Sequence, residues 1–152
     1  MSTPEERLAE LGLEVPEVPT PLASYVPAVR SGNHVLTSGQ LPLRSGELIA
    51  SGKVGAEVSA EEGGECARQC ALNALAAVRA QVGDLSAVRR IVKVVVFVAS
   101  APDFTGQPGV ANGASELFGS VFGDAGKHAR SAVGVAVLPL DAPVEVELTV
   151  EV

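Results

Sequence analysis

One stretch of this 152-residue chain constrains the fold more than any other: residues 88–100, VRRIVKVVVFVAS. Its β-branched residues favour a strand, and such a nearly continuous apolar run is typical of a strand buried on both faces. The run carries Lys93 and is too short to span a bilayer. It therefore predicts the central strand of a sheet with other layers packed against it.

Helical patterns flank this strand on both sides. Ser59 and Glu62 form a capping box, which marks the start of a helix that runs to Gly83. Its apolar residues recur at helical spacing: Ala67, Ala71, Leu75, Val78 and Val82. A second helix ends at Gly123 and has one apolar face: Val110, Ala114, Leu117, Phe118 and Val121. We expect both helices to cover the sheet.

Short strands are predicted before and after these helices. Two lie within residues 25–32 and 33–42, a third within 47–51, and two more, 130–137 and 144–150, finish the chain around the turn-forming LPLDAP. A short helix capped by Thr3 and Glu6 opens the chain and leads into a proline-rich stretch. The order predicts a single α+β domain, in which two helices cover one face of a mixed sheet.

Charge and cysteine usage narrow the function classes. The net charge of −7, with 11 scattered Lys and Arg, disfavours nucleic acid as a partner. The N-terminus lacks the profile of a signal peptide, so we expect a cytoplasmic protein without a membrane partner. Cys66 and Cys70 lie four apart on one helix face and are predicted to be small core residues. No metal-ligand spacing joins them to His34 or His128, which we interpret as structural, although His128 is close enough to Arg130 to influence its surroundings.

Alternation along the two closing strands raises a candidate site. In the first, Arg130 shares a face with Ala132, Gly134 and Ala136, while the opposite face is valine-rich and core-like. The small residues would leave open volume beside the guanidinium. Because a guanidinium matches a carboxylate in shape and charge, this face predicts a small carboxylate ligand. The alternative is a structural salt bridge.

The last strand offers a carboxylate of its own, Glu145, on a face shared with Glu147, Thr149 and Glu151. If the two closing strands form an antiparallel hairpin, Arg130 and Glu145 lie roughly 20 Å apart at 3.3 Å per residue. They could then serve one small ligand only if Glu145 came from a neighbouring subunit. A nearby glutamate can position a water or transfer a proton.

The ordered motifs resemble a known family. YVPAVRSGNHVLTSGQLP, GECARQCALNALAAV, VKVVVFVASAPDF, VANGASELF and ARSAVGVAVLP followed by VEVEL are together similar to the RidA family, also called YjgF, of imine and enamine deaminases. The resemblance covers residues 25–152, with 1–24 as an added helix and proline-rich lead. It implies a chorismate-mutase-like fold, assembled as a homotrimer with sites in the clefts between subunits.

The resemblance also assigns residues and a reaction. It implies that Arg130 binds the substrate carboxylate and Glu145 handles the water, with Tyr25, Ser38, Gly39, Asn112 and Ala132 as substrate-contacting positions. The implied reaction is hydrolysis of a 2-imino acid to a 2-keto acid and ammonia, without a cofactor.

Two positions depart from the family pattern. Ala132 stands where a cysteine is common, and Gly134 where a glutamate is common. Both changes would enlarge the cleft or alter its polarity, so they affect substrate choice more than fold. A non-catalytic protein that binds a metabolite carboxylate is therefore the alternative function. A ribonuclease, as some relatives are labelled, is disfavoured by the acidic balance.

Overall fold

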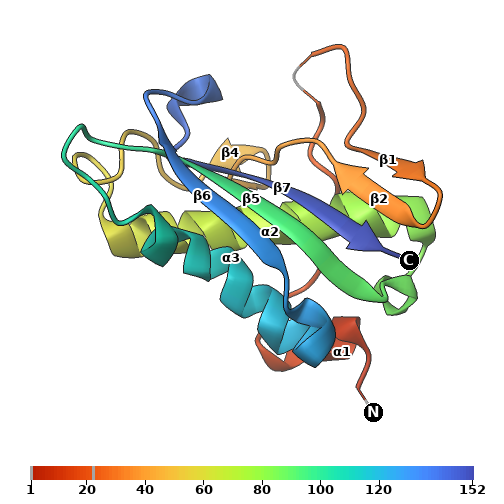
Figure 1. Ribbon diagram of the computed structural model, residues 1–152. Coiled ribbons are helices and arrows are strands. Elements are labelled where there is room, and N and C mark those ends of the chain that lie inside the picture. The colour runs from red at the N-terminus through yellow and green to blue at the C-terminus, as the bar shows by residue number, and fades with distance from the viewer. Residues whose placement is uncertain (1, 22) are drawn as a thin grey trace.

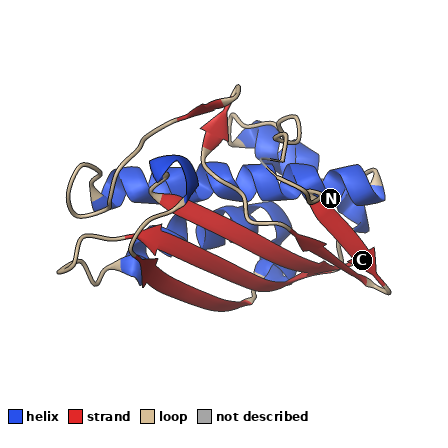
Figure 2. Ribbon diagram, turned by 90° about the horizontal axis from the view of Figure 1, so that it is seen from above, coloured by secondary structure: helices blue, strands red, loops and turns tan. Residues whose placement is uncertain are grey.

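A five-stranded mixed sheet with two long helices along one face forms the body of the protein (Figures 1 and 2). The computed structural model describes residues 2–21 and 23–152. The strand order is β1-β2-β7-β5-β6, and β3 and β4 form a separate two-stranded hairpin. The elements are α1 (Pro4–Glu10), β1 (Ala28–Ser31), β2 (His34–Thr37), β3 (Leu43–Arg44), β4 (Glu47–Leu48), α2 (Ala60–Val82), β5 (Arg90–Ala99), α3 (Gln107–Phe122), β6 (Ala129–Val135) and β7 (Val144–Glu151), with short 3-10 turns η1 (Leu85–Ala87), η2 (Gly123–Gly126) and η3 (Pro139–Asp141). The predicted α+β class is confirmed.

Local sequence signals explain how the helices begin. In α2, the Ser59 hydroxyl accepts from the Glu62 backbone N–H while the Glu62 carboxylate accepts from the Ser59 N–H. Thr3 and Glu6 form the same reciprocal pair at α1. Both capping boxes are thus confirmed, because each satisfies two N–H groups that a helix start leaves without intrahelical acceptors. Leu8 of α1 is fully buried in the common core.

The two long helices touch backbone to backbone. A Cβ atom built on Gly113 of α3 would lie 1.9 Å from the Gly64 carbonyl oxygen of α2. Only glycine permits this approach, which draws α2 and α3 together over the sheet. Cys66 and Cys70 are free and buried beneath α2, as predicted.

The centre of the sheet departs from the expected hairpin. β5 lies between the closing strands: it pairs parallel with β6 and antiparallel with β7. Arg130 is opposite Val94, and Glu145 is opposite Phe97. The prediction that β6 and β7 pair directly is therefore wrong. The chain passes from β5 through α3 to β6, which pairs parallel with β5 at the edge of the sheet. β7 then pairs with the other side of β5.

Helices cover one face of the sheet, and the other face is partly exposed in a single chain. Val94, Val96 and Val98 of β5 face the helices and are fully buried, whereas Val95 and Phe97 on the other face are only half-buried. The prediction that β5 is buried on both faces is wrong for a single chain. We call the uncovered side the outer face. It also carries exposed Val29 and Leu36 of β1 and β2.

The faces of β6 are the reverse of those predicted. Arg130 and Ala132 pair with the helix-facing Val94 and Val96, and Val133 lies on the outer face with 43% of its surface exposed. Ala132 is half-buried and packs against the core, whereas Gly134 on the same side of β6 is exposed. The valine side is not the core side, since a strand's alternation defines two faces without saying which one a helix covers.

The third predicted strand is short. Residues 47–51 contribute only Glu47–Leu48, which pairs with Leu43–Arg44, a strand that the sequence pattern did not indicate. Within the described residues, no helix is long and apolar enough to cross a membrane.

Candidate functional site

Arg130 projects from β6 onto α3. Its Nη1 donates to Asn112 Oδ1 at 2.8 Å and to Ser115 Oγ at 3.2 Å, and its Nη2 donates to the Pro108 carbonyl at 3.3 Å. The three acceptors sit at helical spacing on one stripe of α3. One face of α3 therefore supplies three acceptors for the Arg130 guanidinium. We call Pro108, Asn112 and Ser115 the cradle. Asn112 is where the resemblance predicted a site residue.

The cradle leaves part of the guanidinium available. A guanidinium carries five N–H donors, so three bonds leave the Nε–H and one Nη2–H on adjacent nitrogens. Among the residues that the structure describes, Arg130 has no carboxylate partner, since the ion pair found there joins Lys127 and Asp124. The alternative of a structural salt bridge is thus excluded for this part of the chain, and an adjacent pair of N–H donors suits a carboxylate ligand.

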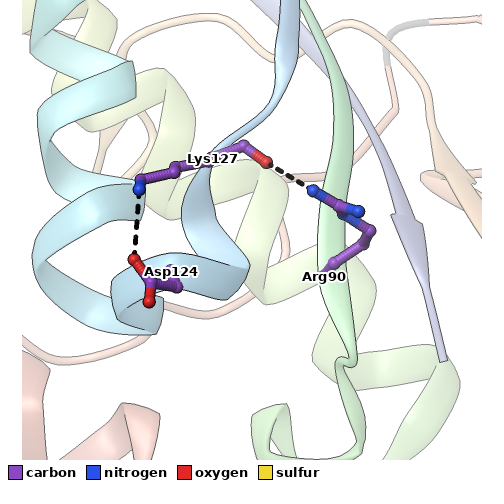
Figure 3. Close-up of polar contacts among 3 residues, drawn as sticks. All are labelled: Arg90, Asp124 and Lys127. Atoms are coloured by element: carbon purple, nitrogen blue, oxygen red, sulfur yellow. Dashed lines mark hydrogen bonds and ion pairs between the residues drawn. The ribbon is translucent and has the colours of Figure 1, made fainter.

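The start of β6 is tied to its surroundings (Figure 3). Lys127 Nζ contacts Asp124 at 3.2 Å, and Arg90 Nη2 of β5 donates to the Lys127 carbonyl at 3.4 Å. Both side chains of the ion pair are largely exposed, so the pair contributes little to stability. These contacts involve Lys127, which lies three residues before Arg130 and two before the first residue of β6, Ala129.

A separate pocket of about 210 Å³ holds a second group of predicted residues. Tyr25, Gly39 and Glu145 line it, from the segment before β1, the segment after β2, and β7. The remaining walls are mainly apolar: Pro19, Thr20, Pro21, Ala23, Pro27, Gln40, Leu41, Leu43 and Pro139. The proline-rich lead thus contributes directly to a candidate site.

Glu145 and Gly39 are in close contact within this pocket. A Cβ atom on Gly39 would lie 2.7 Å from the Glu145 carboxylate, so the glycine makes room for it. The carboxylate accepts no hydrogen bond from any residue of 2–21 or 23–152. Burial, and then the nearby charge of Glu147, raise the pKa of Glu145 above its ordinary value. A carboxylate in such surroundings suits proton transfer near neutral pH.

Ser38 supports the pocket from its rim. Its hydroxyl donates to the Val26 carbonyl at 2.5 Å, next to Tyr25, and its own carbonyl accepts from Gln40 Nε2 at 3.4 Å. Ser38 lies beside the pocket and does not line it. Its observed role is to link the segments before β1 and after β2.

Two buried polar residues of α2 hold the pocket wall, and sequence reasoning missed both. Asn73 Nδ2 donates to the Leu41 and Leu43 carbonyls at 2.9 Å each, and Gln69 Nε2 donates to the Leu43 carbonyl at 3.1 Å. Neither side chain is more than 5% exposed. Their signal in the sequence was a polar pair, four residues apart, on the apolar face of α2, because buried polar groups need partners.

The two halves of the candidate site lie apart within one chain. Arg130 and Asn112 are on the helix-covered side of the sheet, and Glu145, Tyr25 and Gly39 are on the outer side. From the strand order and register, the Cα atoms of Arg130 and Glu145 are on the order of 14 Å apart. This replaces the longer separation expected from a hairpin, and opposite faces still prevent the two side chains from meeting one small ligand in a single chain.

The two divergent positions have different surroundings within one chain. Ala132 packs against the core, and Gln107 Nε2 lies 2.8 Å from the place where a Gly134 Cβ would be. Gln107 is held there by Ser100 Oγ at 3.1 Å and the Phe104 carbonyl at 2.9 Å. Within a single chain a glutamine amide therefore borders Gly134. The change in the size or polarity of the cleft between subunits stays a prediction. Ala132 lines neither half of the candidate site.

Metal and thiol chemistry find no support in the described residues. No group of three or more His, Cys, Asp or Glu side chains in 2–21 and 23–152 is placed to hold a metal ion. Burial raises the pKa of the Cys66 thiol to about 11 and that of Cys70 well above its ordinary value. Thiols of this kind are poor nucleophiles at neutral pH.

Comparison with known proteins identifies the family. Residues 5–152 match the family described as "YjgF/chorismate mutase-like, putative endoribonuclease". The chain belongs to the YjgF family. The predicted resemblance and the chorismate-mutase-like fold are confirmed.

Relatives within the YjgF family carry different names. Protein TCP17 of Trypanosoma cruzi is 48% identical over 145 residues, which cover 95% of this chain and 91% of that protein. The 2-iminobutanoate/2-iminopropanoate deaminase of Escherichia coli K12 is 37% identical over 132 residues, 85% of this chain and 88% of the enzyme. The crystal structure of Atu1372 from Agrobacterium tumefaciens, a protein described as of unknown function, superposes with a TM-score of 0.92 at 46% identity, over 99% of this chain and 92% of that one.

Proposed function

We propose that this YjgF-family protein hydrolyses 2-imino acids to 2-keto acids and ammonia, in clefts between the subunits of a homotrimer. The observation that carries the proposal is a pair of charged side chains, one arginine and one glutamate, that have no partner of opposite charge among the described residues. Arg130 is held by α3 without an acidic partner, and Glu145 stands in an apolar pocket without a hydrogen-bond donor, in the described part of the chain. An imino acid carries the two complementary groups, a carboxylate and a basic nitrogen.

Arg130 binds the substrate carboxylate in this proposal. Its Nε–H and remaining Nη2–H form the two-pronged contact that a carboxylate accepts. Asn112, whose Oδ1 is engaged by Arg130, keeps its amide N–H groups for the ligand. Binding at these positions orients the C=N carbon toward the opposite subunit.

Glu145 of a neighbouring subunit then handles the water. The carboxylate accepts a proton from water as the oxygen adds to the carbon of the protonated C=N group, which gives a neutral carbinolamine. Glu145 returns that proton to the amino nitrogen. The C–N bond then breaks and ammonia leaves, while the carboxylate takes the hydroxyl proton and the C=O bond of the keto acid forms. The raised pKa of Glu145 favours both proton transfers, since a group that gives and takes a proton works best with a pKa near the operating pH.

The outer face supports the homotrimer. Val29 and Leu36 are 51% and 41% exposed, and half-buried Val95 and Phe97 lie between them and Val133. An apolar sheet face of this kind is typical of a surface covered by another subunit. Sedimentation should give three times the 15.4 kDa of one chain, and a monomer would contradict the assembly.

The activity test is release of ammonia and keto acid from 2-imino acids generated in the assay. We expect Arg130→Ala to lower kcat/KM on the order of 100-fold, because a charge-assisted bidentate contact is lost. Arg89→Ala, at an exposed arginine outside both halves of the candidate site, is the matched control and should stay within a few-fold of wild type. Wild-type rates equal to the buffer blank, with 2-keto acids still bound, would instead establish the binding-protein alternative.

A further inference from the structure

A hydrogen-bonded chain continues from Ser115, one of the three acceptors of Arg130, to residues outside both halves of the candidate site. Ser115 Oγ, which accepts from Arg130 Nη1, lies 2.8 Å from His128 Nε2. The other ring nitrogen, Nδ1, lies 2.6 Å from the Gly126 carbonyl oxygen. The chain therefore runs from the guanidinium through a hydroxyl and an imidazole to the backbone.

The hydrogen bond between His128 and the Gly126 carbonyl determines which group donates in each of the other bonds. A carbonyl oxygen only accepts, so His128 Nδ1 carries a hydrogen and donates to Gly126. In the neutral ring Nε2 is then an acceptor, and the Ser115 hydroxyl donates to it. The Ser115 oxygen keeps its lone pairs directed at Arg130, which is the orientation that a guanidinium donor requires.

The far end of the chain is anchored in the core. The His128 ring meets the fully buried Phe118 edge-on, with centroids 5.9 Å apart and planes at 90°. Gly126 packs so tightly that a Cβ atom there would lie 2.3 Å from the Phe118 carbonyl oxygen. The acceptor for His128 is thus fixed by backbone packing between η2 and α3.

We propose that Ser115 and His128 are positioning residues that fix the orientation of the Arg130 guanidinium for its ligand. Together with Asn112, Ser115 occupies both N–H groups of Nη1, so the plane cannot turn without breaking a bond. The free Nε–H and Nη2–H then keep one orientation before any ligand arrives. Such preorganisation strengthens binding because less rotamer freedom is lost on association. The inference rests on the proposed role of Arg130 in carboxylate binding.

The binding test compares two serines of the same helix. Ser115→Ala should weaken binding of 2-oxobutanoate, measured by calorimetry, roughly three- to tenfold, the effect of one lost hydrogen bond. Ser120→Ala, an exposed serine on α3, is the matched control and should bind within twofold of wild type. Ser115→Thr keeps the hydroxyl and should restore most of the affinity. Equal affinities for Ser115→Ala and Ser120→Ala would overturn the proposal.

His128 is tested by His128→Phe, which keeps a ring against Phe118 and removes both hydrogen bonds. His128→Phe should weaken binding, as Ser115→Ala does. The double variant should bind only slightly more weakly than the weaker single variant, because both residues act through one hydrogen-bonded chain. Lys127→Gln, which removes the exposed ion pair next to His128, is the control and should bind as wild type does. Fully multiplicative losses would show that the two residues act independently.

NMR of the ligand-free protein separates this proposal from the proposed function. Histidine ¹⁵N shifts should show His128 as the Nδ1–H form, and the Arg130 Nη groups should give separate signals that merge in Ser115→Ala but not in Ser120→Ala. If wild type bound no 2-oxobutanoate, the proposed function would fail while these signals still decided the positioning role. A hydrogen on Nε2 alone, or unchanged Arg130 signals in Ser115→Ala, would overturn it.

Discussion

The two faces of the sheet differ in how far their side chains are buried and hydrogen-bonded within one chain. On the helix-covered face, valines of β5 and β7 are fully buried and Arg130 has three hydrogen-bond acceptors. On the outer face, Val133 and Leu36 are exposed, and the Glu145 carboxylate meets no donor from the described residues. One chain thus completes its core and the cationic half of the candidate site. It leaves the anionic half on a surface that a second chain would complete.

The helix-covered face should be the less tolerant of the two. Gly113→Ala places a methyl group into the Gly64 backbone, which cannot yield without separating α2 from α3. We expect a loss of about 3 kcal/mol in the free energy of unfolding, measured with urea. The control is Gly109→Ala on the same helix, where a Cβ atom meets nothing within 4 Å and stability should be unchanged or higher. Equal stability of the two variants would mean that the helices are not packed this closely.

Mixing two inactive variants tests whether the faces of different chains combine. Arg130→Ala and Glu145→Gln chains, refolded together, should recover activity in about one site in four, since random assembly brings one intact Arg130 and one intact Glu145 together that often. Each variant refolded alone is the control. Mixed samples that stay at the level of the separate variants would place both residues of a site in one chain.

The lone carboxylate on the outer face should also reduce stability at neutral pH. The folded-state pKa of Glu145 is raised, so the stability linked to this group is present below the unfolded pKa near 4.5 and is lost as pH rises through the folded pKa. Glu145→Gln should therefore raise Tm by roughly 1–3 °C at pH 7. The gain should shrink toward pH 4. A lower Tm for Glu145→Gln at pH 7 would show that a cation approaches this carboxylate in the assembled protein.

The last prediction concerns the two thiols in the core under α2. Cys66 and Cys70 are buried under α2 with raised pKa values, so an aromatic disulfide reagent at pH 8 should label the folded protein about 100-fold more slowly than the urea-unfolded chain. The unfolded chain, which should label at both cysteines, is the control. Rapid labelling of the folded protein would show that this face opens readily.

Local signals in the sequence predicted much of the fold. The capping boxes at Thr3 and Ser59 each depend on residues three apart, so neighbouring sequence contains all the information required. The helices, the central strand and the fold class followed from such patterns together with the family resemblance. The pairing of β6 and β7 did not, because adjacency in sequence favours adjacency in a sheet and here β5 intervenes.

In the candidate site, too, the sequence predicted individual residues but did not predict their arrangement in the fold. Motif resemblance singled out Arg130, Asn112, Tyr25, Gly39 and Glu145, and the structure gathers them into two groups. Which face each group occupies depends on where α3 crosses β6, a long-range contact that no local pattern records. For the same reason Gln107 beside Gly134, and the chain from Ser115 through His128, became visible only with the fold.

The pocket around Glu145 is walled partly by chain without helix or strand. Pro19, Pro21 and Pro27 line it, and Pro16 precedes them in the lead. Proline restricts its own backbone in the unfolded chain as well as in the folded one, so ordering this segment costs less conformational entropy than ordering other sequences of equal length. A wall with few backbone hydrogen bonds can thereby keep its shape. Replacing these prolines would loosen the pocket without touching a residue of the proposed chemistry.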